Sequence, residues 1–298
     1  MNETVLIFGS GGQDGHYLHR LCSERGMAVA TVSRSSGSHP GDVADPEFVQ
    51  AVVAQIRPDY VFHLAAWSTT AHEALAHNHA TIAGGTWNVC EAVRSSCPDA
   101  RVFITGTGLQ FENRGQPIDE NCPFAATSPY AVERIHSAYA ARYFRSLGLR
   151  TYVGYLFHHD SPRRRPDHVS MKIAQAAVRI SSGNRVPLEL GATEVEKEWG
   201  FAEDIAAAML TLVEQDDVPE AVLGTGVAHP ISRWLDLCFG RVGLDWTDHV
   251  RPVEGFQPQF ARLVSDPKTI RTLGWEPRVE IDELSRLMMR EVSALATT

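Results

Sequence analysis

Short apolar segments alternate with amphipathic ones along most of the chain. Five runs rich in apolar and β-branched residues predict strands: Val5–Phe8, Ala28–Val32, Tyr60–Leu64, Val102–Thr105 and Thr151–Leu156. Segments with apolar residues at helical spacing separate them and include Pro46–Ile56, Ala83–Val93 and Ala131–Phe144. Fully apolar strands are typical of a parallel sheet that is covered on both faces. We therefore predict an α/β fold with a Rossmann-like, doubly wound parallel sheet, whose ligands bind at the carboxyl ends of the strands.

Three glycines follow the first predicted strand directly. Gly9, Gly12 and Gly15 give the spacing GxxGxxG between that strand and the next helical segment. In a dinucleotide-binding fold such glycines permit a tight turn, the approach of the backbone to a pyrophosphate, and close packing of the helix on the sheet. We expect this loop, which also contains Gln13 and Asp14, to contact a dinucleotide cofactor.

The second predicted strand runs into Ser33-Arg34-Ser35-Ser36 rather than into an acidic residue. A carboxylate there would accept hydrogen bonds from a free ribose 2′-hydroxyl and repel a phosphate. Arg34 and Ser35 instead suit a 2′-phosphate through charge-assisted hydrogen bonds, although they also suit a solvated polar loop. We expect NADP, with NAD as the alternative. Asp42 is a candidate partner for the adenine amine, whereas Asp45 suits a helix N-cap.

Small residues follow the third predicted strand. Leu64, Ala65 and Ala66 would let the cofactor lie across the strand end, and Ser68 would then point into the substrate cleft. His63 precedes the strand end and has no acidic neighbour in the sequence. We expect it to be a packed histidine rather than a catalyst.

Tyr130 and Arg134 lie four positions apart in the helix predicted after Ser128. This spacing places both on one helical face, where a cation can stabilise a phenolate and hold a ribose hydroxyl. An arginine keeps the charge that a lysine would supply, but it is bulkier and does not release its proton. The competing interpretation is that Arg134 points to solvent from an ordinary amphipathic helix.

Composition bears on the binding partners and the location of the protein. The 298 residues are 44% apolar with a formal net charge of −9, which gives no general attraction to nucleic acid or to an anionic membrane. No apolar run reaches transmembrane length and no basic leader precedes the first strand, so we expect a cytoplasmic location. Five cysteines without a CxxC pair suit reduced thiols, and neither a disulfide framework nor a metal site is expected.

Four segments together resemble the GDP-mannose 4,6-dehydratase family of extended short-chain dehydrogenases/reductases, which act on nucleotide sugars. They are GGQDGHYL at 11–18, SPYAV at 128–132, LFHHDSPRR at 156–164, and Trp199-Gly200. The resemblance extends to the GWEP turn at 274–277 and the last helix, so it covers nearly the whole chain. In the wider group the tyrosine transfers the proton and the cation is a lysine, which implies catalytic roles for Tyr130 and Arg134.

The chain is expected to divide into two parts. Residues 1–157 would form the NADP-binding Rossmann domain. Residues 158–298 would form mainly a smaller C-terminal lobe that binds the nucleotide sugar, interleaved with the last strands of the sheet.

The resemblance also assigns residues at the reacting end of the site. Thr107 takes the position of a hydroxyl that hydrogen-bonds the sugar 4-oxygen, whereas Leu109 stands where the family has a glutamate. Dehydration needs a base for the C5 proton and an acid for the departing 6-hydroxyl, and leucine can serve as neither. Glu112, Glu120 and the His158-His159 pair remain as alternatives.

Further substrate contacts are implied in the second half of the chain. Lys172, Lys197 and Arg251 match basic family positions near the diphosphate, and His158 stands where the family has an asparagine that faces the substrate. The run Arg163–Arg165 matches a family loop that crosses a subunit boundary, which implies a homodimer or homotetramer.

Three functions are compatible with these residues. The first is an NADP-dependent oxidoreductase acting at C4 of a GDP-hexose or related nucleotide sugar, for example by reducing a 4-keto group. In it Tyr130 donates or accepts the proton, Thr107 polarises the 4-oxygen, and Arg134 stands for the lysine. The second is a dehydratase or epimerase with an unidentified base. The third is a non-catalytic cofactor-binding protein.

Overall fold

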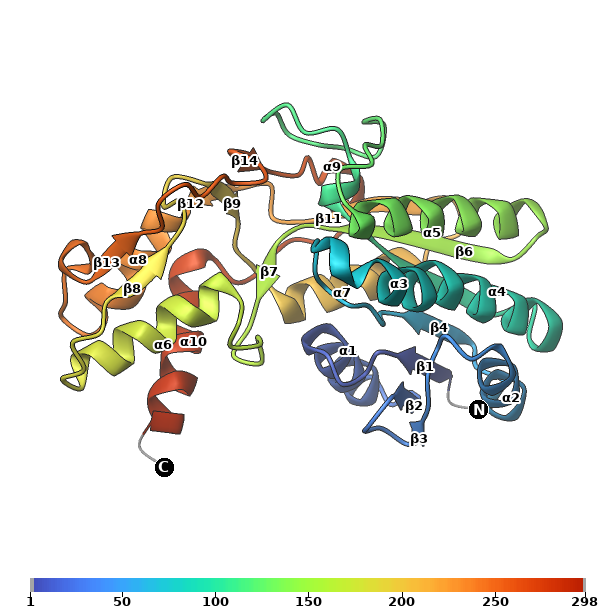
Figure 1. The fold of residues 1–298 in the computed structure, drawn as a ribbon. Helices are drawn as coiled ribbons and strands as arrows, with labels where there is room; N and C mark the ends of the chain where they lie inside the picture. Colours follow the sequence, from blue (N-terminus) through green and yellow to red (C-terminus); the bar gives the residue numbers. More distant parts are fainter. Residues whose placement is uncertain (1–2, 297–298) are drawn as a thin grey trace.

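The computed structural model describes residues 3–296, and a seven-stranded parallel sheet forms its larger part (Figure 1). The strand order is β11-β6-β5-β4-β1-β2-β3. The strands span Thr4–Phe8 (β1), Ala28–Ser33 (β2), His39–Pro40 (β3), Tyr60–His63 (β4), Arg101–Thr107 (β5), Arg150–Leu156 (β6) and Glu220–Leu223 (β11). All six pairings in this sheet are parallel, which confirms the predicted α/β fold with a Rossmann-like sheet.

Helices cover both faces of the sheet. On one face α1 (Gln13–Glu24) packs against α7 (Ala202–Val213), and on the other α4 (Gly85–Ser96) packs against α2 (Pro46–Ile56) and α5 (Pro129–Ser146). Along β1, Val5 and Ile7 enter the first core while Leu6 and Phe8 enter the second, and all four are fully buried. The strand is apolar throughout because successive side chains point to opposite, covered faces.

The five expected strands all form, with ends that differ by at most two residues from the predicted ones. The helix expected from residue 83 is different. A 3-10 turn η1 (His72–Ala74), a short helix α3 (Leu75–Asn78) and a π-helical turn η2 (His79–Gly84) lead into α4. Hydroxyls of Thr86 and Ser137 donate to the carbonyl of Ile82 at 2.7 and 3.2 Å and compete for it with the regular helical ladder.

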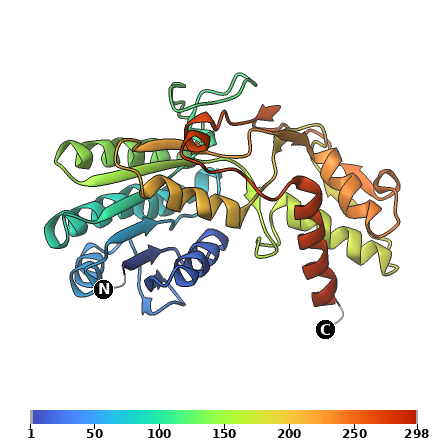
Figure 2. The same cartoon turned by 180° about the vertical axis from the view of Figure 1, so that it is seen from behind.

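The remaining elements form a smaller lobe beside the sheet (Figure 2). Its helices α6 (Val169–Ser181), α8 (Ile231–Gly240) and α10 (Ile281–Ala296) pack on one another. Its short strands are β7 (His159–Asp160), β8 (Leu188–Leu190), β9 (Glu196–Glu198), β10 (Gly200–Phe201), β12 (Ala228–Pro230), β13 (Val250–Pro252) and β14 (Arg262–Leu263). Three short helices complete the fold: η3 (Gly108–Gln110), η4 (Trp246–Asp248) and α9 (Lys268–Thr272). Because β11 and α7 belong to the large sheet, the second half of the chain contributes to both parts.

No helix within residues 3–296 combines the length and the apolar composition that crossing a membrane requires. All five cysteines are free, and Cys22, Cys90 and Cys238 are buried.

Candidate active site

A cavity of about 420 Å³ opens at the carboxyl ends of β1, β2 and β4, where the strand order reverses. Every cofactor contact expected in the first 66 residues lines it: Gly9, Gly12, Gln13, Asp14, Gly15, Arg34, Ser35, Asp42, Leu64, Ala65 and Ala66. Ser68 and the basic run Arg163–Arg165 line it as well, whereas Tyr130 and Arg134 do not. The structure thus gathers residues from six separate segments of the sequence around one cavity.

Two glycines of the first loop have no room for a side chain. Gly9 has φ of +88°, and a Cβ there would lie 2.6 Å from the backbone nitrogen of Ala65. A Cβ on Gly15 would lie 2.6 Å from the Cα of Ser10. The loop therefore packs backbone against backbone, which leaves the floor of the cavity free for a phosphate.

The start of α1 is tied to the second lobe by side chains. His159 lies on β7 with Nε2 2.9 Å from Asp14 Oδ1, while its Nδ1 donates to the carbonyl of Phe157 at 2.7 Å. Burial alone would raise the pKa of Asp14, but His159 holds it below the ordinary value. Burial alone would lower the pKa of His159, but the charge of Asp14 and its hydrogen bond raise that pKa above the ordinary value. Gln13 joins the same contact by accepting from the Ser161 hydroxyl at 3.0 Å.

Arg34 lies on an aromatic ring at the cavity wall. Its guanidinium carbon is 4.6 Å from the ring centroid of Trp67, which also lines the cavity. Within residues 3–296 no carboxylate forms an ion pair with Arg34, so its charge is available to an anion. Asp42 accepts from the backbone of Ala44 at 3.0 Å, and Asp45 caps α2 as the sequence predicts.

His63 is a packed side chain, as expected. It is 1% exposed, and its Nε2 donates to the carbonyl of Ile82 at 3.4 Å. Burial, together with the positive charge of Arg134, lowers the pKa of His63 to about 4. The imidazole is therefore neutral and helps to hold η2 against the sheet.

Arg134 points into the protein and not to solvent. It is 3% exposed, its Nη1 donates to the carbonyl of Thr105 at 2.5 Å, and its guanidinium carbon lies 5.1 Å from the ring centroid of Tyr130. Ser128 begins α5 by accepting from the backbone of Ala131, which places Tyr130 in the first helical turn. The cation thus connects the tyrosine to the end of β5, and the interpretation of Arg134 as a surface residue is wrong.

Thr107 ends β5 and caps the short helix η3. Its Oγ1 accepts from the backbone of Leu109 at 3.3 Å, and Gln110 Oε1 accepts from the backbone of Thr107 at 2.9 Å. Leu109 borders a second cavity of about 340 Å³. No carboxylate or histidine of the described chain lines that cavity; its lining is Gly108, Leu109, Phe111, Asn113, Arg114, Gly115, Thr127 and Gln259–Leu263.

The two alternative carboxylate bases are engaged elsewhere. Glu112 forms an ion pair with Arg114 at 2.8 Å. Glu120 accepts from the backbone of Val222 at 2.6 Å and from Thr269 at 3.1 Å, and burial raises its pKa. His159, a third candidate base, is paired with Asp14. His158 is the fourth.

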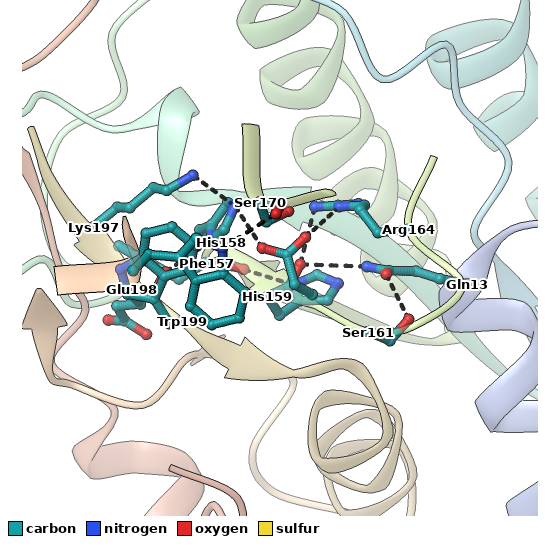
Figure 3. Close-up of polar contacts among 12 residues, drawn as sticks. Gln13, Phe157, His158, His159, Ser161, Arg164, Ser170, Lys197, Glu198 and Trp199 are labelled. Carbon is teal, nitrogen blue, oxygen red and sulfur yellow. Dashed lines mark hydrogen bonds and ion pairs between the residues drawn. The ribbon is translucent and has the colours of Figure 1, made fainter. Parts of the chain in front are cut away.

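His158 belongs to a buried chain of charged groups between the two parts of the protein (Figure 3). Its Nδ1 donates to the carbonyl of Glu198 at 2.7 Å, which leaves Nε2 to accept from Lys197 Nζ at 2.9 Å. Asp160 Oδ2 lies 3.1 Å from the same Nε2, and Asp160 Oδ1 pairs with Arg164 at 2.6 Å. Burial, reinforced by Lys197, holds the pKa of His158 well below its ordinary value.

Lys197, which the resemblance places near the substrate diphosphate, is buried in this structure. It is 7% exposed, and burial lowers its pKa to about 8. Its Nζ also lies 4.6 Å from the ring centroid of Trp199. Lys172 on α6 and Arg251 on β13 are exposed. Of the three expected phosphate cations, two are therefore open to solvent and one is already enclosed by His158 and Trp199.

The basic run Arg163–Arg165 lies at the cavity of its own chain. Arg164 is held there by Asp160 and by the carbonyl of His159 at 2.9 Å. Sequence reasoning missed the pairing of Asp14 with His159 and the stacking of Arg34 on Trp67, since each joins segments that are distant in the sequence. The charged segment HHDSPRR was the available signal for the first of them.

Comparison with known proteins agrees with this geometry. A family model described as GDP-mannose 4,6 dehydratase matches residues 6–288. The chain is 32% identical to GDP-mannose 4,6 dehydratase 1 of Arabidopsis thaliana, covering 99% of this chain and 91% of the relative.

Two solved structures have the same fold. UDP-glucose 4-epimerase of Thermus thermophilus, solved with NAD, has a TM-score of 0.84 at 23% identity, covering 97% of this chain and 98% of that one. RMD of Pseudomonas aeruginosa, solved with NADPH, has a TM-score of 0.86 at 19% identity, covering 99% of both chains. The chain belongs to the GDP-mannose 4,6 dehydratase family, within the extended short-chain dehydrogenase/reductase enzymes.

Proposed function

We propose that this enzyme transfers hydride between a nicotinamide cofactor and C4 of a nucleotide sugar, with reduction of a 4-keto sugar as its main reaction. One observation carries the proposal. Arg134 lies over the ring of Tyr130, whereas Leu109 stands where the resembled family has a glutamate, and the nearby Glu112 and Glu120 are bound by other groups. The chain therefore has the side chains proposed for hydride transfer at C4, but it lacks a base at position 109 for dehydration.

Each retained side chain has a role in that reaction. A bound nicotinamide supplies or accepts the hydride. Tyr130 gives a proton to the 4-oxygen during reduction or takes it during oxidation. Thr107 already accepts a hydrogen bond from Leu109, so its own hydroxyl proton is free to bind the 4-oxygen. Arg134 holds the ring of Tyr130 beside β5, with its guanidinium carbon 5.1 Å from the ring centroid.

NADP is the cofactor that the cavity suits better. The closely packed Gly9 and Gly15 leave a backbone cradle for the pyrophosphate. Arg34, stacked on Trp67 and without an ion-pair partner among residues 3–296, suits a 2′-phosphate. We also propose that Tyr130 and Arg134 bind the ribose of the cofactor.

The substrate proposed is a GDP-hexose or a related nucleotide sugar. The name of the Arabidopsis relative supports guanine. Exposed Lys172 and Arg251 are the cations proposed for the diphosphate, and Ser68 and His158 are proposed to face the sugar. Lys197 would take part only if its contact with His158 opened. A homodimer or homotetramer and a cytoplasmic location complete the proposal, and the free thiols suit the latter.

A dehydratase remains the second candidate because the family and its named relative are dehydratases. It requires a base that reaches C5. His158 is the remaining candidate, and its Nε2 could take a proton only after Lys197, which now donates to it, moved away.

The test is to incubate the enzyme with NADPH or NADH and, separately, with NADP⁺ or NAD⁺, in each case with a panel of GDP- and UDP-sugars together with their 4-keto derivatives, and to follow products by mass. We expect a 4-keto sugar to gain two hydrogens, with NADPH preferred. Loss of water from a 4-hydroxy sugar would support the dehydratase instead. Binding without turnover would identify a non-catalytic protein. The matched control is Tyr130→Phe, which keeps the ring but removes the proton donor.

A further inference from the structure

Three metal-binding side chains converge on the outer side of the tyrosine helix, away from the cofactor cavity. His79 begins η2, and Glu133 and His136 lie on α5 three residues apart, so they share one helical face. His79 Nδ1 is 3.1 Å from Glu133 Oε2, and His136 Nδ1 is 3.7 Å from the same oxygen. The ligand atoms that the three residues offer all lie within 4.8 Å of one another.

These separations fit one small cation. A transition metal lies about 2.0–2.2 Å from imidazole nitrogen and carboxylate oxygen, which sets tetrahedral ligand atoms roughly 3.3–3.6 Å apart. The two measured separations of 3.1 and 3.7 Å fall on either side of that value. The nitrogens of His79 and His136 lie within 4.8 Å of each other, and rotation of these two exposed side chains would bring them to the separation that a metal requires.

We propose that His79, Glu133 and His136 form a binding site for a divalent transition metal such as Zn²⁺ or Co²⁺. Two imidazoles and one carboxylate favour such ions over Mg²⁺ or Ca²⁺, which prefer oxygen ligands. Three protein ligands leave a further position for water. Sequence spacing predicts no metal site here, because His79 lies 54 residues before Glu133.

Burial gives the site one fixed ligand and two accessible ones. The Glu133 side chain is 9% exposed, whereas those of His79 and His136 are 61% and 43% exposed. The carboxylate is therefore held in place between two imidazoles that solvent can reach. A metal can enter from that side without opening the core.

The metal would join η2 to α5 next to the residues proposed for catalysis. Glu133 directly precedes Arg134, and Ser137 on the same helix already donates to the carbonyl of Ile82 in η2 at 3.2 Å. The metal adds a further connection between these elements, and none of its three ligands lines the cofactor cavity. Its expected effect is to stabilise the fold around Tyr130, and the inference does not depend on the reaction proposed above.

Trp87 provides a built-in reporter. Its Nε1 donates to His136 Nε2 at 3.4 Å, so Nδ1 carries the proton of the neutral ring. Binding a metal through Nδ1 moves that proton to Nε2, which then no longer accepts from the indole. Emission from Trp87 should therefore change when the metal binds.

The test is calorimetric titration of the full, untagged chain with Zn²⁺, together with Co²⁺ absorption and tryptophan emission. We expect one ion per chain and a rise in Tm with Zn²⁺. His79→Ala and His136→Ala should each weaken binding by about tenfold or more, and Glu133→Gln should do the same. The matched control is His72→Ala, a nearby exposed histidine outside the cluster, which should leave binding unchanged.

His79→Ala also removes the 3.1 Å contact with the buried Glu133 carboxylate, so the Tm of each variant with Zn²⁺ is compared with its own Tm without metal. The metal-induced rise in Tm should disappear. Zn²⁺ binding that is unaffected by His79→Ala and His136→Ala would overturn the proposal. The absence of Zn²⁺ and Co²⁺ binding in the unsubstituted chain would overturn it too.

Discussion

The guanidinium of Arg134 lies over the ring of Tyr130, with its central carbon 5.1 Å from the ring centroid, and donates to the carbonyl of Thr105 on β5. One side chain thereby connects the tyrosine helix to the strand that carries Thr107. A lysine has a single ammonium group and cannot present the planar fork that spans both contacts. Arg134 is consequently part of the packing as well as of the proposed chemistry.

Arg134→Lys should therefore lower the rate of hydride transfer. We expect roughly a tenfold or greater loss in the rate constant for hydride transfer, because a lysine would not contact both the ring of Tyr130 and the carbonyl of Thr105. The measurement is single-turnover oxidation of NADPH with a 4-keto nucleotide sugar. Arg145→Lys, on the same helix but paired with Glu220, is the control and should leave the rate unchanged. A faster Arg134→Lys enzyme would mean that the arginine impairs the site.

Leu109→Glu should introduce the base that the site lacks. The new carboxylate would lie at the cavity that Leu109 borders, whose lining within the described chain holds no carboxylate. We expect solvent deuterium to exchange into C5 of a bound 4-keto sugar, measured by NMR, and to do so faster than in the parent enzyme. Leu109→Gln has nearly the same shape without a basic oxygen and is the control. Equal exchange in both variants would place the responsible base elsewhere.

Gly9, between β1 and α1, should not accept a side chain without a loss of stability. Gly9 and Gly26 both have positive φ, at +88° and +77°, but only Gly9 has backbone atoms within 3 Å of a would-be Cβ. Gly26→Ala should cost about 1 kcal/mol in free energy of unfolding through backbone strain alone. Gly9→Ala should cost at least about 1 kcal/mol more through the clash with Ala65. Urea denaturation measures both free energies of unfolding. Equal losses in the two variants would mean that the loop moves to accommodate the new methyl group.

Sequence patterns identified the sheet because its strands are apolar on both faces. Val5 to Phe8 illustrates this, since the four side chains divide between two cores and leave no polar position. The same local logic identified Gly9, Gly15 and the N-cap at Asp45. Their spacing along the chain is a local feature and could be predicted, whereas the backbone of Ala65 that packs against Gly9 comes from a distant segment.

Contacts between distant segments could not be predicted in the same way. Lys197 reads as a surface cation, yet strand β9 turns it onto His158 and Trp199. The direction of Arg134 was equally open in the sequence, because helical periodicity alone does not say which face of α5 meets β5. The π turn at His79–Gly84 depends on the Ser137 hydroxyl of another helix.

The buried Lys197 should leave a signature in the pH dependence of stability. Burial lowers its folded-state pKa to about 8, against 10.5 for an unperturbed lysine. Between those values the unfolded chain binds more protons than the folded one, so the free energy of unfolding should increase with pH. The contribution is up to about 1.4 kcal/mol per pH unit.

Replacing the lysine isolates this contribution. Lys197→Met should remove the extra slope between pH 8 and 10.5 while leaving the slopes from other groups in place. Urea denaturation of both proteins across this range measures the difference. Identical slopes would mean that Lys197 is solvated and retains its ordinary pKa.

Transfer of deuterium from reduced cofactor to sugar is the most direct test of the proposed reaction. The enzyme is incubated with NADPH labelled at the transferable position and a 4-keto GDP-hexose, and the product is analysed by mass and NMR. The account predicts one deuterium on C4 of a product that has gained two hydrogens in total and kept its oxygen atoms. Recovery of the 4-keto sugar without deuterium at C4 would contradict it, as would loss of water from a GDP-hexose incubated in parallel with NADP⁺.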